Sequence, residues 1–160
     1  MQSQLSPLCF TGKRYFLTHT NFTRKESKMN PIKVLLVDDE EKFVISNAKL
    51  LNKRGYDVST ALNGQEALQK LETNDIDVTV LDVKMTGMDG ITVLKEIKNR
   101  FPLVEVVMLT GHATFETAVT GLKIGASDYL MKPSELKELI QKIEEAYEKR
   151  KIQEAKIRHK

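Results

Sequence analysis

Residues 34–39 read Val-Leu-Leu-Val-Asp-Asp, an apolar run that ends directly in two carboxylates. The same arrangement recurs at residues 78–82, Val-Thr-Val-Leu-Asp, and Lys132 follows a third apolar run at residues 129–131. Strands that are apolar at nearly every position are typically buried on both faces of a parallel sheet. The ends of such strands open onto the ligand crevice. Three carboxylates and one ammonium group are therefore expected to meet at one edge of a sheet.

From residue 31 onward, short apolar runs alternate with amphipathic segments, which is the pattern of βαβ units. Right-handed crossovers would place helices on both faces of the resulting sheet. The pattern predicts a doubly wound (βα)5 fold with a five-stranded parallel sheet. Strands are expected over residues 32–37, 57–61, 77–81, 104–109 and 128–131.

The intervening segments predict five helices with recognisable ends. The first covers residues 41–54 and ends at Gly55, and the second is capped by Asn63. The third begins at Asp89 or Gly90 and ends before Phe101-Pro102. The fourth covers residues 114–124, with Ala118, Val119 and Leu122 facing inward. The last is capped by Ser134, and its apolar stripe ends at Tyr147, beyond which the helix is expected to protrude or fray.

The charge is divided unevenly along the chain. Residues 1–28 hold five basic residues and one acidic residue, and residues 149–160 hold six basic residues and one acidic residue. The segment between them holds 14 basic and 20 acidic residues, so the body is acidic although the whole chain carries a formal charge of +3. The basic ends therefore say little about the functional surface.

Composition and length limit the class of protein. A chain of 160 residues suffices for one domain with a core, here residues 31–148, with a basic helical extension or tail at 149–160. Residues 1–30 are interpreted as a disordered N-terminal extension rather than a transit peptide. Because Met29 stands just before the first predicted strand, a further hypothesis is that residues 1–28 lie upstream of the natural start. No run reaches the length of a membrane span. The single cysteine, Cys9, favours a reducing, cytoplasmic compartment.

The carboxylates at the strand ends indicate a cation site. Asp38 and Asp39 follow the first strand and Asp82 follows the third, and carboxylates brought together raise each other's pKa unless a cation compensates them. Mg²⁺ prefers carboxylates, carbonyls and water, and it leaves positions for phosphate oxygens. Two glycines in the loop at residues 82–90 would leave the Asp82 carboxylate exposed above the sheet, where it could act as a nucleophile on a phosphoryl group.

Other strand ends add groups that suit a phosphoryl ligand. Thr110 ends the fourth strand and offers a hydroxyl, while Lys132 offers a compact positive charge. Pro133 allows a cis peptide bond after the lysine. His112 is expected to be solvated, without a catalytic or metal-binding role.

The ordered set of motifs resembles the response-regulator receiver domain. It comprises Asp-Asp after strand one, Asp-x-x-Met-x-Gly-Met-Asp-Gly after strand three, Thr after strand four and Lys-Pro after strand five, within residues 31–148. The resemblance implies a flavodoxin-like sheet with strand order 2-1-3-4-5. It also implies a signalling domain rather than an enzyme, with self-phosphorylation from a donor and autodephosphorylation as its only chemistry.

The same resemblance implies a role for each site residue. Asp82 would accept a phosphoryl group from a sensor histidine kinase or a phosphotransfer protein, with Mg²⁺ held by Asp39, Asp82 and the carbonyl of Lys84. Asp38 would act through a metal-bound water, and Thr110 and Lys132 would contact the phosphoryl group. Tyr129 matches the switch aromatic of the family, and a separate downstream effector protein would receive the signal.

Two positions depart from the family pattern. Thr86 stands where the family often has proline, a change expected to loosen the loop slightly without touching a metal ligand. Lys84 resembles the subset of receivers with a basic residue two positions after the phosphorylated aspartate.

Several alternatives are weighed against this interpretation. A phosphate sink or a phosphorelay intermediate would use the same chemistry. A haloacid-dehalogenase phosphohydrolase needs Asp-x-Asp after its first strand, and a P-loop needs Gly-Lys-Ser/Thr, which the chain lacks. A flavodoxin-like FMN carrier is disfavoured, because Asp38 and Asp39 would repel the phosphate. Direct binding to nucleic acid or a membrane is not expected, since about a dozen residues after Tyr147 cannot form an output domain.

Overall fold

The computed structural model describes residues 30–112 and 114–160. The N-terminal extension predicted for residues 1–30, with Cys9, lies outside the described residues except for Asn30. Among the described helices, none combines the length and apolar character that a membrane span requires.

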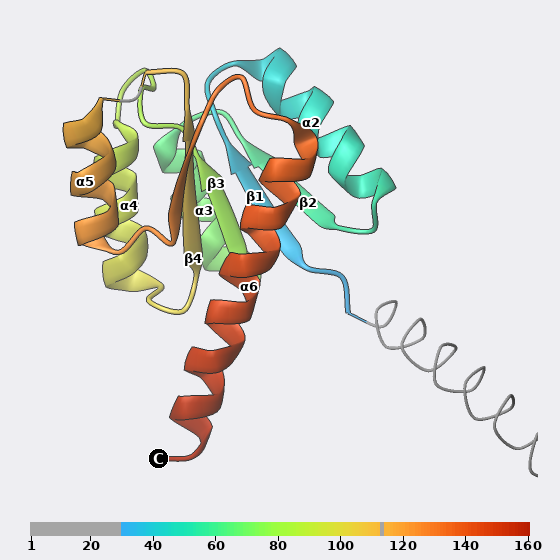
Figure 1. The fold of residues 1–160 in the computed structure, drawn as a ribbon, viewed down its shortest axis with the longest axis vertical. Helices are drawn as coiled ribbons and strands as arrows, with labels where there is room; N and C mark the ends of the chain where they lie inside the picture. Colours follow the sequence, from blue (N-terminus) through green and yellow to red (C-terminus); the bar gives the residue numbers. More distant parts are fainter. Residues whose placement is uncertain (1–29, 113) are drawn as a thin grey trace, which may run out of the picture. The chain divides into compact units, whose positions relative to one another are not determined.

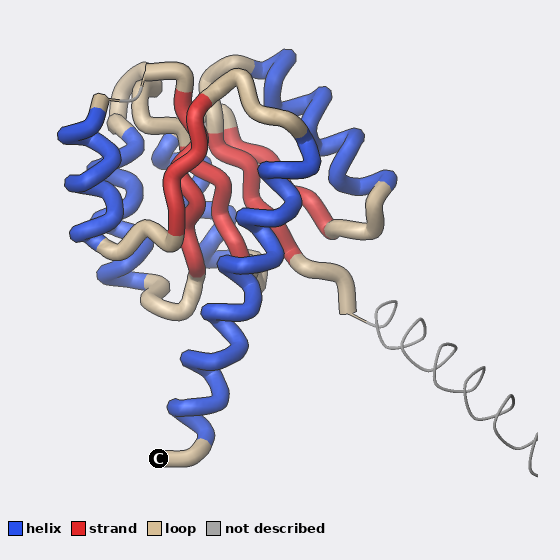
Figure 2. Tube along the Cα trace, viewed as in Figure 1, coloured by secondary structure: helices blue, strands red, loops and turns tan. Residues whose placement is uncertain are grey.

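The described chain forms one sheet of five parallel strands in the order β2-β1-β3-β4-β5 (Figures 1 and 2). Both the doubly wound class and the predicted strand order are therefore confirmed. The strands are β1 (Lys33–Val37), β2 (Asp57–Ala61), β3 (Val78–Leu81), β4 (Glu105–Thr110) and β5 (Asp128–Met131).

Helices cover both faces of this sheet, α2 and α6 on one and α3, α4 and α5 on the other (Figure 1). Alternate residues of β1 explain why the strand is apolar throughout. Val34 and Leu36 pack toward α2 and α6, whereas Leu35 and Val37 pack toward α3 and α4. The helices are α2 (Glu41–Lys53), α3 (Gly64–Thr73), α4 (Gly90–Arg100), α5 (Phe115–Ile124) and α6 (Leu136–Arg158).

Short polar side chains begin three of the helices, largely as predicted. Asn63, Asp89 and Thr114 each accept a hydrogen bond from the backbone N–H three residues later. The prediction for α6 is wrong by one residue. Glu135, not Ser134, is the N-cap residue, and its side chain makes no capping hydrogen bond.

The inward face of α5 differs from the prediction. Leu122 is 48% exposed, and the buried residue on this helix is Gly121. A Cβ added at Gly121 would lie 3.7 Å from Met108 of the sheet and 4.0 Å from Leu94 of α4. Because successive residues of a helix are rotated by about 100°, turning Gly121 inward carries Leu122 toward solvent.

α6 is anchored at Arg150, and beyond this residue it protrudes from the sheet, as predicted, as a continuous and mostly exposed helix (Figure 1). The helix continues to Arg158, through most of the basic segment 149–160. Arg150 is only 8% exposed, and its guanidinium donates to the carbonyl of Ile76 at 2.5 Å. It also pairs with Asp77 at 3.4 Å and with Glu154 at 2.9 Å. The apolar stripe therefore ends in a cation that binds the loop before β3.

We expect Arg150→Ala to lower the free energy of unfolding by about 2 kcal/mol, because it removes the side-chain donor of the buried Ile76 carbonyl and the cation that pairs with Asp77. Urea denaturation followed by circular dichroism measures the loss. Lys151→Ala is the matched control, since that side chain is half exposed and contacts Glu148 and the Tyr147 ring of its own helix. Equal unfolding free energies for the two variants would contradict the anchoring role of Arg150.

Candidate functional site

Parallel pairing brings the residues after the strands to one edge of the sheet. The hydrogen-bond ladder continues past the strand ends, from Asp38 N–H to the carbonyl of Ala61 at 3.1 Å and from Asp82 N–H to that of Val37 at 3.0 Å. On the other side, Lys132 N–H donates to the carbonyl of Thr110 at 2.9 Å. The sheet itself therefore fixes the side chains that the sequence singled out.

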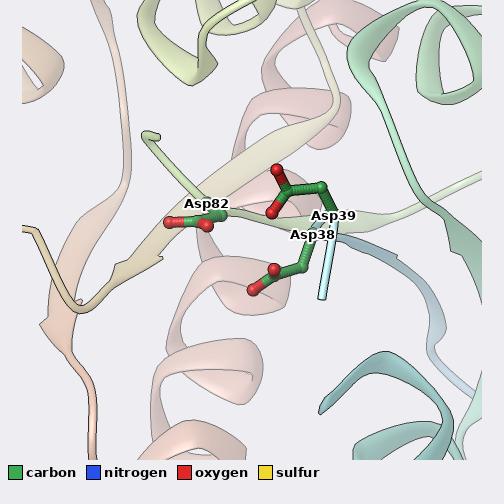
Figure 3. A group of neighbouring side chains, drawn as sticks. All are labelled: Asp38, Asp39 and Asp82. Atoms are coloured by element: carbon green, nitrogen blue, oxygen red, sulfur yellow. The ribbon is translucent and has the colours of Figure 1, made fainter. Parts of the chain in front are cut away.

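Asp38, Asp39 and Asp82 form a carboxylate cluster at this edge (Figure 3). One oxygen from each of the three lies within 4.8 Å of the others, a separation at which a single cation could bind all three. Asp38 and Asp82 are buried, whereas Asp39 is exposed. The cluster has the composition and spacing of a site for a hard divalent metal ion.

Asp82 is buried, not exposed above the sheet as the glycines of its loop predicted. It is 6% exposed, and Oδ1 has no hydrogen-bond partner among the described residues. Burial raises the pKa of this carboxyl group, and the charge of Asp38 raises it further. The neighbouring Thr110 hydroxyl, the charge of Lys132 and the Lys84 N–H lower the pKa without cancelling the rise. Oδ1 of Asp82 can therefore still accept a ligand, and the charges of the surrounding described residues do not fully offset the charge of its carboxylate.

Lys132 crosses the site from the end of β5. Its ammonium group pairs with Oδ2 of Asp38. The other oxygen of Asp38, Oδ1, accepts a hydrogen bond from the N–H of Glu40 at 2.9 Å. The same ammonium nitrogen lies 4.0 Å from the centre of the Phe43 ring in α2. A cation over an aromatic face is attracted to it, so Phe43 and Asp38 together hold the lysine over the cluster.

The remaining predicted residues lie around this cluster. Thr110 is fully buried, and its Oγ1 accepts the N–H of His112 at 3.1 Å. The Tyr129 hydroxyl is buried without a partner among the described residues, and the ring packs against the core of the α3–α5 face. The Lys132-Pro133 peptide bond is cis. Lys84 and His112 are exposed, as expected for the histidine.

The contact between Thr86 and Asp39 shows that one prediction was wrong. It was expected to stay clear of the metal ligands, but its backbone N–H and its hydroxyl both donate to Oδ2 of Asp39, at 3.0 and 3.1 Å. The sequence drew attention to the position without revealing this contact, because Asp39 and Thr86 lie on different loops. Phe43 was likewise not singled out, since nothing in the sequence pairs it with Lys132.

Gly90 sets how closely α4 approaches the strand end that carries Asp82. A Cβ at this position would lie 2.1 Å from the carbonyl oxygen of Asp82 and 2.7 Å from Cα of Val83. The Gly90 N–H donates to the Val83 carbonyl at 2.7 Å. In the Asp-Gly pair at residues 89–90, Asp89 therefore caps α4, and Gly90 permits the close approach of α4 to the backbone of Asp82 and Val83.

Comparison with known proteins agrees with this geometry. The family model described as "Response regulator receiver domain" matches residues 34–144. This chain belongs to the response-regulator receiver domain family. The matched span runs from the second residue of β1 past the end of β5 and contains every residue of the carboxylate cluster.

Individual relatives support the same family. The receiver is 37% identical over 131 residues to a putative NtrX-like response regulator of Rickettsia bellii, covering 81% of this chain and 27% of the relative. It is 40% identical over 115 residues to the transcriptional regulatory protein ZraR of Escherichia coli K12, covering 72% of this chain and 26% of the relative. The chain thus spans about a quarter of the length of these curated relatives.

A solved structure extends the likeness to the fold. The CheY-like receiver domain protein from Methanospirillum hungatei superimposes with a TM-score of 0.74 at 30% identity, covering 78% of this chain and 99% of that one. The family consists of receiver domains of two-component response regulators, which are signalling domains rather than classical enzymes.

Proposed function

We propose that this receiver accepts a phosphoryl group on Asp82 from a sensor histidine kinase or a phosphotransfer protein, in a Mg²⁺-dependent reaction, and then switches conformation. The observation that best supports the proposal is the buried Asp82 carboxylate, with an unpartnered Oδ1 beside two other carboxylates and within the field of Lys132. In our assignment residues 31–148 form the receiver proper, 1–30 are an N-terminal extension and 149–160 a basic helical extension.

The residues of the cluster fit a magnesium ion. Asp39, Asp82 and the carbonyl of Lys84 would hold the ion, with Asp38 nearby. Oδ1 of Asp82 has no hydrogen-bond partner among the described residues, which leaves it available as a metal ligand. When bound, the ion would offset the negative charge of the carboxylates and of the phosphoryl oxygens.

The chain's own residues account for the rest of the transfer. A carboxylate oxygen of Asp82 would attack the phosphorus of a phosphohistidine, forming an O–P bond as the P–N bond breaks. The electron pair of the broken bond would leave with the imidazole of the donor, which then takes a proton from solvent. Lys132, held by Asp38 and Phe43, would pair with the charge on the transferred group.

A switch can start from the groups that lie closest to the new phosphate. Thr110 is buried near Asp82, so added phosphoryl oxygens would offer its hydroxyl an acceptor. Tyr129 lies two residues before Met131, whose strand position pairs with Thr110. Movement of Thr110 would change the space available to Tyr129, which is a population shift driven by differential contacts.

The expected output surface is formed by α5, β5 and α6. Phe115 is 84% exposed at the start of α5, and Leu122 and Met131 are also exposed on α5 and β5. Exposed apolar side chains of this kind suit an effector that binds one of two conformations. The effector and the cognate kinase are expected to be proteins or domains outside the receiver proper.

Amide chemical shifts recorded with and without a beryllium fluoride adduct of Asp82 test the proposed switch. We expect shifts in the loop around Asp82 and also across residues 110–132, because the signal must pass Thr110 and Tyr129. Asp82→Asn should show neither set of changes. Changes confined to the loop around Asp82 would instead favour a phosphate sink that buffers a kinase.

A further inference from the structure

The loop between β3 and α4 contacts the exposed carboxylate of the cluster. Asp39 is the one member of the cluster that lies in solvent, and the hydrogen bonds that it accepts from described residues both come from Thr86. Asp38, in contrast, is buried and held by Glu40 N–H and Lys132. Without Thr86, the Asp39 side chain would be free to rotate among its rotamers.

The Thr86 contact uses only one of the two oxygens of Asp39. Both donors of Thr86 converge on Oδ2, so the other oxygen is left for a cation. The loop that carries Thr86 is itself fixed at its far end, where Gly90 N–H donates to the Val83 carbonyl. Asp39 and Asp82 are thereby linked through one short loop, although they come from different strand ends.

We propose that Thr86 is a positioning residue for the metal ion, because it orients the Asp39 carboxylate before the ion arrives. This inference rests on the proposed Mg²⁺ site and adds a residue to it. Groups that hydrogen-bond a metal ligand fix its orientation, so less freedom is lost when the metal binds. The backbone N–H supplies one donor whatever the side chain, except in proline, and the hydroxyl supplies the second.

A series of variants at residue 86 removes these donors one at a time. Thr86→Ser keeps both donors, Thr86→Val keeps the N–H alone, and Thr86→Pro keeps neither. We expect unchanged Mg²⁺ affinity for the serine variant, a loss of several-fold for valine and a loss of about tenfold for proline. Thr92→Val is the matched control, because it removes an exposed hydroxyl in α4, outside the loop that carries Thr86.

Titration of the full chain with Mg²⁺ alone, followed by calorimetry and by amide shifts, measures these affinities. In the metal-free protein the Thr86 amide proton should also move upfield in Asp39→Asn, which would show that the bond from Thr86 to Asp39 forms before any metal binds. The circular dichroism spectrum checks that each variant is folded. If the proline variant does not fold, the serine and valine variants still decide the matter.

The outcomes separate this inference from the proposed function. Equal Mg²⁺ affinity in the serine, valine and wild-type proteins, with Asp39→Ala losing affinity, would overturn the role of Thr86 while leaving the metal site intact. A wild-type protein that binds no more Mg²⁺ than Asp39→Ala would overturn both. A graded loss that serine rescues would support the inference.

Discussion

Substitution of Asp82 by asparagine is expected to abolish labelling by a small phosphodonor in the presence of Mg²⁺. The amide that replaces the carboxylate is a poor nucleophile, and no other carboxylate of the cluster has both a buried unpartnered oxygen and the Lys132 and Thr110 neighbours. Incorporated phosphate, measured by intact mass, should fall from one group per chain to none. Asp57→Asn is the matched control, because that aspartate is exposed at the start of β2.

The stability of the Asp82→Asn variant gives an independent check. Burial raises the pKa of Asp82 in the folded state, so the folded protein binds this proton more tightly than the unfolded chain does. Above both pKa values the ionised group therefore lowers stability, and this cost appears as the pH rises through the unfolded and then the folded pKa. The asparagine variant should unfold at higher urea than wild type at pH 7. Full labelling of a folded Asp82→Asn would refute the assignment.

Removal of the Asp39 carboxylate should abolish most of the Mg²⁺ binding and most of the phosphorylation. Each carboxylate adds attraction to a hard dication, so loss of a direct ligand should lower the affinity for Mg²⁺ by more than about tenfold. Calorimetric titration of Asp39→Ala with Mg²⁺ measures the affinity, and mass spectrometry measures the label. Asp39 is exposed, so the fold should tolerate the change.

His112→Ala is the control for the Asp39 experiment, because the imidazole is exposed near the same loops and only its backbone N–H bonds to Thr110. It should bind Mg²⁺ as the wild type does. Equal losses in the two variants would show that the site has been placed wrongly.

The strands and the grouping of the carboxylates could be predicted from the sequence because both depend on local pattern. Continuous apolar runs mark strands buried on two faces, and a parallel sheet brings their carboxyl ends together. Asp38, Asp82, Thr110 and Lys132 each follow or end such a run. Helix starts at Asn63 and Asp89 were equally local, since each side chain caps its own first turn.

The features that were missed depend on segments far apart in the chain. The end of the apolar stripe predicted that α6 would protrude or fray beyond Tyr147. It does protrude, but the sequence did not reveal that Arg150 contacts the loop at residues 75–77, which supplies carboxylates and a carbonyl. The rotation of α5 follows from the space between Met108 and Leu94, not from the apolar pattern of the helix. The bonds from Thr86 to Asp39 and the contact of Lys132 with Phe43 likewise join separate loops.

The central claim is that the phosphoryl group is carried by Asp82. Its most direct test is reduction of the phosphorylated wild-type protein with borohydride, which converts an aspartyl-phosphate to homoserine and releases the phosphate. Peptide mapping then locates the changed residue. The proposal predicts homoserine at position 82, and only when Mg²⁺ was present during labelling. Homoserine at position 38 or 39, or a label that borohydride leaves intact, would contradict it.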